Sequence, residues 1–279
     1  MKLKQKLQEG NRPVGGWCSL PAPGVAEVLA TAEFDFVTVD TEHAPTSTES
    51  VEHAVRAIEA APGETAPLVR IGTIDHARIK RVLDTGPAGV MAPQVNTAAD
   101  ARELVRGCRY PRQQRGPSSP SEHTTDESTS DDRSDDVCRG RRGVAASRAS
   151  NYGRRLDEYV RNAAESLAVI AQIETPEAVK NAGNIASVPG IDALFVGPAD
   201  LSASLGRFRE FDDPAFADAV EKTVTAGNDA GVPVGTLATT DERIDAWLDA
   251  GFDFLIVGTD IGFLGAGADR AIERYQRKL

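Results

Sequence analysis

The chain has 279 residues, of which 41% are hydrophobic and 26% charged, and its formal net charge is −11 at pH 7. This length is enough to bury a sizeable core in one large domain or two small ones. No run of about 18 apolar residues is present to span a bilayer. The polar start MKLKQKLQEGNRP has no apolar core like that of a secretory signal. We therefore expect a cytoplasmic protein without a membrane partner. The acidic charge, with no basic stripe, argues against nucleic-acid binding.

Three widely spaced cysteines, Cys18, Cys108 and Cys138, support neither a disulfide framework nor a CxxC metal knuckle. We expect them to be reduced thiols. Lysine is scarce while acidic residues are abundant. This surface composition favours a salt-adapted, halophilic cytoplasm, and an acidic mesophilic protein is the alternative.

Short apolar runs alternate along the chain with amphipathic stretches of helical length. The predicted strands are residues 14–20, 34–40, 68–71, 89–93, 167–174, 191–197, 232–237 and 252–258. Helical stretches follow them at 26–33, 47–61, 75–86, 97–110, 176–188, 215–231 and 241–251, and a last one ends the chain. Several helices end in glycine just before the next strand, which is a typical C-terminal signal.

Strands that are continuously apolar and joined by helices indicate a parallel sheet covered by helices. Eight strand–helix units in roughly 250 residues fit a (β/α)8 barrel, the TIM-barrel fold, better than an open doubly wound sheet. No G-x-G-x-x-G follows the first strand and no G-x-x-x-x-G-K-[ST] occurs, which disfavours a nucleotide-binding fold. We predict a single α/β domain over residues 1–279.

Residues 112–142 break the pattern because they are crowded with Ser, Thr, Asp, Glu and Arg and nearly lack large apolar side chains. Such a segment cannot offset its ordering entropy by burial. We predict a disordered acidic insertion, interpreted as a surface loop, with a lid or a partner-binding tail as the functional alternative.

Polar residues follow almost every predicted strand, and in a parallel barrel the carboxyl ends of the strands form the active-site rim. They are Ser19, Asp40, Glu42, His43, Arg70, Gln94, Gln172, Glu174, Asp200, Ser202, Thr236 and Asp260. Any one of the acids alone is more often a helix cap than a functional group. Their convergence on one rim raises the expectation of function.

Glu174 and Asp200 end neighbouring strands and offer hard oxygen ligands, with no cysteine or histidine cluster beside them. This pair suits Mg²⁺ or Mn²⁺, with water and substrate filling the other positions. Arg70 ends its strand as a receptor for a substrate carboxylate, with a rim salt bridge as the alternative. His43 directly follows the second strand, and histidine is a residue type well suited to act as a general base near neutral pH. Asp84 could fix the tautomer of His43, or it could be a solvated helix acid.

A metal, a carboxylate receptor and a base together suit chemistry beside a carbonyl group. A Schiff-base route needs a lysine at the rim, and none of the lysines ends a predicted strand. The sequence therefore predicts metal-assisted enolate chemistry beside a carbonyl group and disfavours a Schiff-base route.

The motifs DTEHAP, PLVR, LDTG, PQVNTAADA, RGVAASRASNYG, AQIET and FVGPADLSASLG, taken in order, resemble the HpcH/HpaI family of class II, metal-dependent 2-oxo acid aldolases. The resemblance covers nearly the whole chain except the acidic insertion, which the family lacks. The insertion is either a real surface loop or the product of an altered reading frame.

The resemblance implies a phosphoenolpyruvate/pyruvate-type TIM barrel that cleaves a 2-oxo-4-hydroxy acid to pyruvate and an aldehyde through a metal-stabilised pyruvate enolate. It also implies a divalent cofactor (Mg²⁺, Mn²⁺ or Co²⁺) and a homo-oligomer, commonly a hexamer that exchanges its last helix. The implied residues are His43 as base, Arg70 as carboxylate and enolate ligand, Asp84 as the acid that raises the basicity of His43, Gln172, Ala199 and Asp200 as substrate contacts, and Glu174 and Asp200 as metal ligands.

Two alternatives remain open from the sequence. One is a lyase acting on a CoA thioester, of the citrate or malyl-CoA lyase type, which would need a basic or adenine-binding surface. The other is a barrel that the insertion has disabled and that serves as an oligomeric scaffold.

Overall fold

Eight parallel strands close into a barrel in strict chain order, β1 to β8, which confirms the predicted (β/α)8 fold. The computed structural model describes residues 2–111 and 139–279. The strands are β1 (Val14–Cys18), β2 (Phe36–Asp40), β3 (Ala66–Arg70), β4 (Gly89–Ala92), β5 (Ala168–Ile173), β6 (Ala193–Val196), β7 (Val234–Leu237) and β8 (Phe254–Thr259).

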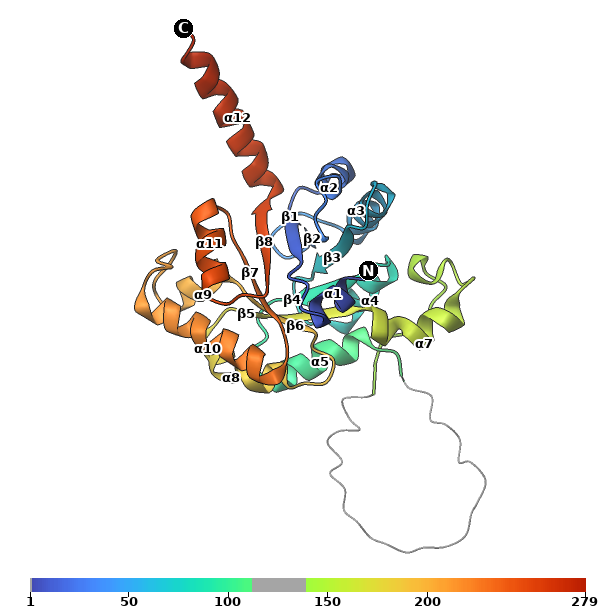
Figure 1. Ribbon diagram of the computed structural model, residues 1–279. Helices are drawn as coiled ribbons and strands as arrows, with labels where there is room; N and C mark the ends of the chain where they lie inside the picture. Colours follow the sequence, from blue (N-terminus) through green and yellow to red (C-terminus); the bar gives the residue numbers. More distant parts are fainter. Residues whose placement is uncertain (1, 112–138) are drawn as a thin grey trace, which may run out of the picture.

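The helices surround the barrel (Figure 1). They are α1 (Leu3–Gln8), α2 (Pro23–Ala30), α3 (Thr48–Ala60), α4 (His76–Asp84), α5 (Ala98–Cys108), α7 (Leu156–Ser166), α8 (Pro176–Ala186), α9 (Pro198–Ser204), α10 (Pro214–Ala230), α11 (Asp241–Asp249) and α12 (Asp260–Gln276), with a 3₁₀ turn η1 (Arg148–Ser150). Two of the predicted helices, those at 47–61 and 97–110, begin with Ser47 and Thr97 capping the first turns of α3 and α5.

Side chains alternate between the inside and the outside of the barrel along each strand, as the period of two requires. The inward set forms one core cluster that includes Trp17, Phe36, Leu68, Ile170 and Phe254. The outward set packs against the helices in a second, larger cluster. Because the inward position of β2 is occupied by Phe36 and that of β3 by Leu68, residues at even spacing from them, further along each strand, also point inward at the rim.

The amino-terminal end of the barrel is closed by α1, a short helix that the sequence pattern did not predict. Leu3 and Leu7 lie four residues apart and join the inner core cluster. Lys4 forms an ion pair with Asp192 at 3.0 Å, and its Nζ also donates to the carbonyl of Ala164. The polar start of the chain therefore plugs the barrel instead of remaining in solvent.

The predicted insertion at 112–142 falls largely outside the described residues, since the structure describes only its last four positions. Of these four, Gly140 and Arg142 are buried, whereas Arg139 and Arg141 are exposed. Arg139 forms an isolated bridge with Pro111. Arg142 lies over the rings of Tyr110 and Tyr159, at 4.6 and 5.2 Å from their centroids. The extent of the insertion at 112–142 stays a prediction.

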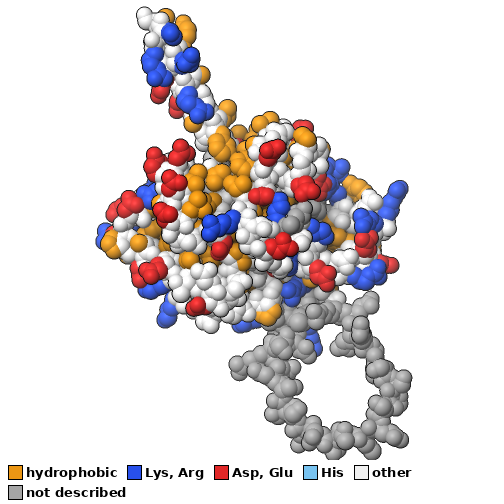
Figure 2. Space-filling view, viewed as in Figure 1, with side chains coloured by type: hydrophobic (Ala, Val, Ile, Leu, Met, Phe, Trp, Pro, Cys, Tyr) orange, Lys and Arg blue, Asp and Glu red, His pale blue; other side chains and the backbone are white. Residues whose placement is uncertain are grey.

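The last helix, α12, projects away from the barrel beyond β8 (Figure 1). Its apolar side chains Ile261, Phe263, Leu264, Ile272 and Tyr275 are exposed. Apolar side chains also gather where it leaves the barrel (Figure 2). Across the two stretches of chain that the structure describes, no helix is long and apolar enough to cross a membrane.

Candidate active site

Arg70 and Asp40 form a buried, two-pronged ion pair at the rim of the barrel. They are register partners at the ends of β3 and β2, so the sheet itself places them side by side. Arg70 donates from Nε to Asp40 Oδ1 at 2.9 Å and from Nη2 to Oδ2 at 2.8 Å. Asp40 is 2% exposed and Arg70 7%. Burial opposes ionisation of Asp40, but the hydrogen bonds and charge of Arg70 outweigh it and lower the pKa of the carboxyl.

Two further contacts hold the guanidinium of Arg70, and Thr41 holds its backbone. Its central carbon lies 4.5 Å from the centroid of the Trp17 ring, within cation–π distance. Its Nη1 lies 3.0 Å from Glu42 Oε2. Its backbone carbonyl accepts hydrogen bonds from both the amide and the hydroxyl of Thr41. The side chain therefore has one orientation, with the remaining N–H groups left for a ligand.

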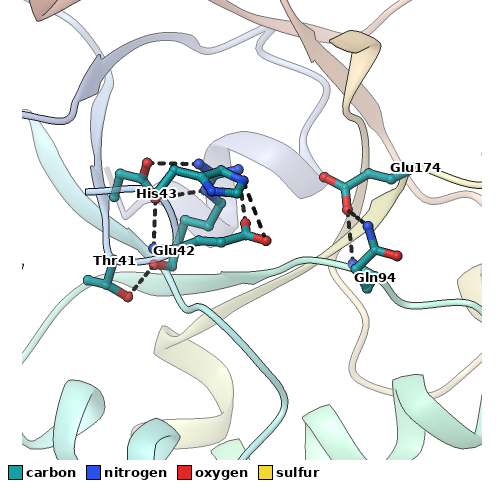
Figure 3. Close-up of polar contacts among 7 residues, drawn as sticks. Thr41, Glu42, His43, Gln94 and Glu174 are labelled. Atoms are coloured by element: carbon teal, nitrogen blue, oxygen red, sulfur yellow. Dashed lines mark hydrogen bonds and ion pairs between the residues drawn. The ribbon is translucent and has the colours of Figure 1, made fainter. Parts of the chain in front are cut away.

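His43 lies at the mouth of the barrel, on the loop that follows β2. Its Nε2 is 3.8 Å from Glu42 Oε1, and 67% of its side chain is exposed. Figure 3 shows Glu42 and His43 on one side of the mouth and Glu174 with Gln94 on the other. An imidazole in this position can reach a ligand that enters the barrel from solvent.

Glu174 lies just after β5, is 2% exposed and is held from one side by Gln94. Its Oε2 accepts hydrogen bonds from the backbone amide of Gln94 at 3.0 Å and from Nε2 of the same residue at 3.2 Å. Gln94 has a φ of 55°, a left-handed conformation that is uncommon outside glycine and that aims both donors at the carboxylate. Burial and the negative charge of Asp200 raise the pKa of Glu174 to about 7, although the Gln94 hydrogen bond opposes the shift.

Gln172, Ala199 and Asp200 complete this side of the rim. Gln172 points inward two residues before Glu174 on β5, and its buried Oε1 has no hydrogen-bond partner among the described residues. Ala199 and Asp200 are exposed in the first turn of α9. The charge of Asp200 acts on both Glu174 and Glu42, so all three acids share one electrostatic environment.

The donor set on this side fits a divalent cation. Glu174 and Asp200 are oxygen donors from neighbouring elements, and hard cations such as Mg²⁺ take one or two carboxylates and keep water or substrate oxygens elsewhere. The raised pKa of Glu174 indicates that the described residues supply too little positive charge to this carboxyl. The unpartnered Oε1 of Gln172 is a further oxygen at the same site. No cluster of three or more His, Cys, Asp or Glu side chains able to hold a metal is found within residues 2–111 and 139–279.

Asp84 does not meet His43 within this chain. It ends α4, which runs antiparallel to the strands, so it lies at the opposite end of the barrel from the rim. Its Oδ1 lies 3.3 Å from Nη2 of the buried Arg142. A role for Asp84 beside His43 stays a prediction.

Other polar residues of the predicted rim are structural. Asp260 is buried and accepts from the amides of Ser19 and Leu20, at 3.0 and 2.8 Å, which fastens the loop after β1 to the start of α12. The hydroxyl of Thr236 donates to the carbonyl of Val196, and that of Ser202 donates to the carbonyl of Ala199. The sequence predicted their positions at the rim, but it did not show which of them hold loops and strands together and which could bind a ligand.

The roles of Asp40, Trp17 and Gln94 were missed at the sequence level, although Asp40 and Gln94 were expected at the rim. The signal for Asp40 is its position, since it ends the strand next to that of Arg70 and both strands are apolar up to that point. For Gln94 the deciding feature is a backbone conformation that the sequence does not reveal.

Comparisons with known proteins find relatives that match this chain over nearly its whole length. The hydroxypyruvate/pyruvate aldolase of Roseobacter denitrificans is 34% identical over 264 residues, which cover 94% of this chain and 92% of that protein. The 4-hydroxy-2-oxo-heptane-1,7-dioate aldolase of Escherichia coli is 34% identical over 275 residues, with coverage of 98% and 94%. The crystal structure of an HpcH/HpaI aldolase/citrate lyase family protein from Burkholderia cenocepacia matches with a TM-score of 0.86 at 35% identity, over 98% of each chain.

The model of one protein family spans the barrel from its first strand into α12. It matches residues 14–265, and its description is HpcH/HpaI aldolase/citrate lyase. The chain therefore belongs to the HpcH/HpaI aldolase/citrate lyase family.

Proposed function

We propose that the protein is a class II, divalent metal-dependent aldolase that cleaves a 2-oxo-4-hydroxy acid to pyruvate and an aldehyde. The observation that carries the proposal is that positive and negative side chains lie on opposite sides of the barrel rim. The guanidinium of Arg70, bonded to Asp40, lies on one side. Glu174 and Asp200, which pair with no cation among the described residues, lie on the other. The aldolase names of the relatives support the same reaction class.

Glu174 and Asp200, with Gln172 beside them, would hold the cation. A bound Mg²⁺ or Mn²⁺ supplies Lewis acidity to the 2-oxo and carboxylate oxygens of the substrate. The backbone of Ala199, in the first turn of α9, would contact the pyruvate part of the substrate beside Asp200.

Arg70 and His43 would carry the protein's own part of the reaction. His43 takes the proton of the 4-hydroxyl group as the C3–C4 bond breaks, and the bonding electrons pass to the pyruvate fragment as its enolate. Arg70, oriented by Asp40 and Glu42, stabilises the negative charge on that fragment. Protonation of C3 then gives pyruvate. The exposed position of His43 suits a base that must reach both the substrate hydroxyl and solvent.

The test is to incubate the protein with Mg²⁺ or Mn²⁺ and a panel of 4-hydroxy-2-oxo acids, and to follow pyruvate with lactate dehydrogenase. We expect activity that EDTA abolishes and that Glu174→Gln removes. The matched control is Glu177→Gln, which changes an exposed acid three residues away and should leave activity intact. No pyruvate from any substrate with either metal would contradict the proposal. Release of CoA from a thioester in a parallel assay would instead favour the citrate-lyase type of reaction.

A homo-oligomer, with a hexamer as the specific expectation, is also proposed. The exposed apolar side chains of α12 support it, since exposed apolar surface of this kind commonly marks an interface. Because Asp84 and His43 lie at opposite ends of one barrel, an Asp84 that serves His43 has to come from a second chain. Mixing inactive His43→Ala and Asp84→Ala subunits should then restore part of the activity, and light scattering gives the subunit number.

A further inference from the structure

A second pocket lies outside the barrel, between α3 and α4, next to the active-site loops. Its volume is about 230 Å³, and none of its lining residues is acidic. Apolar side chains of the outer core cluster, Val51, Ile71 and Val82, line part of it. Hydroxyl groups at the start of α3, including those of Thr46 and Thr48, and the guanidinium groups of Arg78 and Arg81 line the rest. A pocket with this lining offers hydrogen-bond donors and positive charge.

Arg78 and Arg81 are on the same face of α4, three residues apart. Neither forms an ion pair with a carboxylate anywhere in residues 2–111 or 139–279. In the larger pocket of about 480 Å³ at the other end of the barrel, by contrast, Arg56, Arg148 and Arg155 each pair with a glutamate. The smaller pocket therefore holds positive charge that no described acid neutralises.

The pocket wall is continuous with the two strands that carry the catalytic ion pair. Thr41 directly follows Asp40, and Ile71 and Gly72 directly follow Arg70. A Cβ built on Gly72 would lie 3.3 Å from the carbonyl oxygen of Thr41 and 4.0 Å from Nη1 of Arg78, so the three groups adjoin. Thr41 in turn donates two hydrogen bonds to the carbonyl of Arg70, at 3.0 and 2.7 Å. A ligand that orders Thr41 and Gly72 thus acts on the backbone that positions Arg70.

We propose that this pocket binds a phosphate-class oxyanion, either free phosphate or the phosphoryl group of a small metabolite, and that its occupancy changes the affinity of the active site for 2-oxo acids. Two guanidinium groups and several hydroxyls match the oxygens of such an anion. The pocket is smaller than those that take drug-sized ligands, which fits a compact anion. The second half of the proposal rests on the proposed function, whereas the first half does not.

Calorimetric titration of the metal-free protein with inorganic phosphate and with glycerol 3-phosphate tests binding without any need for activity. The variant is Arg78→Gln/Arg81→Gln, which keeps helix-compatible side chains at two exposed positions. The control is Lys80→Gln/Lys180→Gln, which removes the same charge from other surfaces. We expect the arginine variant to weaken binding by at least about tenfold for each arginine and the control to change it little. Phosphate that binds at Arg70 instead would still bind to the arginine variant, so the variant distinguishes binding at Arg70 from binding in this pocket.

Repeating the titration with saturating pyruvate tests the coupling, because each ligand must change the affinity for the other by the same factor. A pyruvate-dependent shift in phosphate affinity, absent from the arginine variant, would support the proposal in full. Phosphate binding that pyruvate leaves unchanged would overturn the coupling. No phosphate binding by the parent protein, equal binding by the arginine variant, or a preference for malonate over both phosphates would overturn the site. Circular dichroism of both variants checks that they fold like the parent protein.

Discussion

The substitution Asp40→Asn removes the charge from the best-ordered ion pair at the rim while keeping the size of the side chain. Asp40 and Arg70 are both buried and are joined by two hydrogen bonds of 2.8 to 2.9 Å. Removing one partner of a buried pair leaves the other charge uncompensated and costs about 3–5 kcal/mol of unfolding free energy. The asparagine of the variant can still accept a hydrogen bond, and Glu42 stays 3.0 Å from the guanidinium. We therefore expect the lower end of this range, about 3 kcal/mol.

Urea unfolding at fixed protein concentration measures the effect, with Asp218→Asn as the control. Asp218 pairs with Lys222 at 2.6 Å on the exposed face of α10, where such a pair contributes only about 0–1 kcal/mol. A double-mutant cycle of Asp40→Asn with Arg70→Met isolates the pairwise free energy, expected to be about 2 kcal/mol or more. The reasoning fails if the cycle is additive or if Asp40→Asn destabilises the protein no more than Asp218→Asn does.

The pH dependence of the same variant gives a second check. The folded state lowers the pKa of Asp40 below its ordinary value of 3.8. Its ionised form is therefore favoured by folding, and the stabilisation is present at neutral pH and lost as the pH falls through the lowered pKa. The stability difference between parent and Asp40→Asn should shrink in that acidic range. A difference that stays constant with pH would contradict the charge-based explanation.

Three further predictions follow from the other side of the rim. The pKa of Glu174 is raised from 4.5 to about 7, so the metal-free protein should lose stability as the pH rises across this interval, whereas Glu174→Gln should not; urea unfolding in EDTA compares the two pH profiles. Gly197→Ala places a Cβ 2.7 Å from Glu174 Oε1, so it should displace the carboxylate and weaken Mn²⁺ binding by about tenfold or more, which a calorimetric titration would show. Asp260→Ala leaves the half-buried amides of Ser19 and Leu20 without their acceptor, which should cost about 1–2 kcal/mol of unfolding free energy in the same urea assay.

The sequence predicted the barrel because buried parallel strands are apolar on both faces, so their lengths and spacing stand out. The same search for apolar runs and stripes did not reveal helices α1 and α7. In α1 only Leu3 and Leu7 are apolar contacts, within one short polar segment, and their burial depends on the barrel end that they close. In α7 the one buried residue is Ala163, which gives no visible apolar stripe. Helices whose packing depends on distant partners lack a local signature.

The sequence predicted which residues lie at the rim, but not which of them bond to one another. Arg70 and Glu174 follow from strand ends and residue chemistry alone. Which acid pairs with Arg70 depends on the register of β2 against β3, and this pairing assigns Asp40 rather than Glu42 as its two-pronged partner. The support of Glu174 by Gln94 depends on a positive φ, which no sequence pattern indicated.

The opposite pKa shifts of Asp40 and Glu174 connect the ion pair to the proposed metal site. Both carboxyls are buried at the same rim, yet the pKa of Asp40 is lowered because Arg70 bonds to it directly, while that of Glu174 is raised because the charge of Arg70 only partly offsets burial and the charge of Asp200. The guanidinium of Arg70 is thus bonded to Asp40, on one side of the mouth. Glu174 and Asp200 would hold a divalent cation on the other side, whose charge would add to that of Arg70 in stabilising a developing enolate.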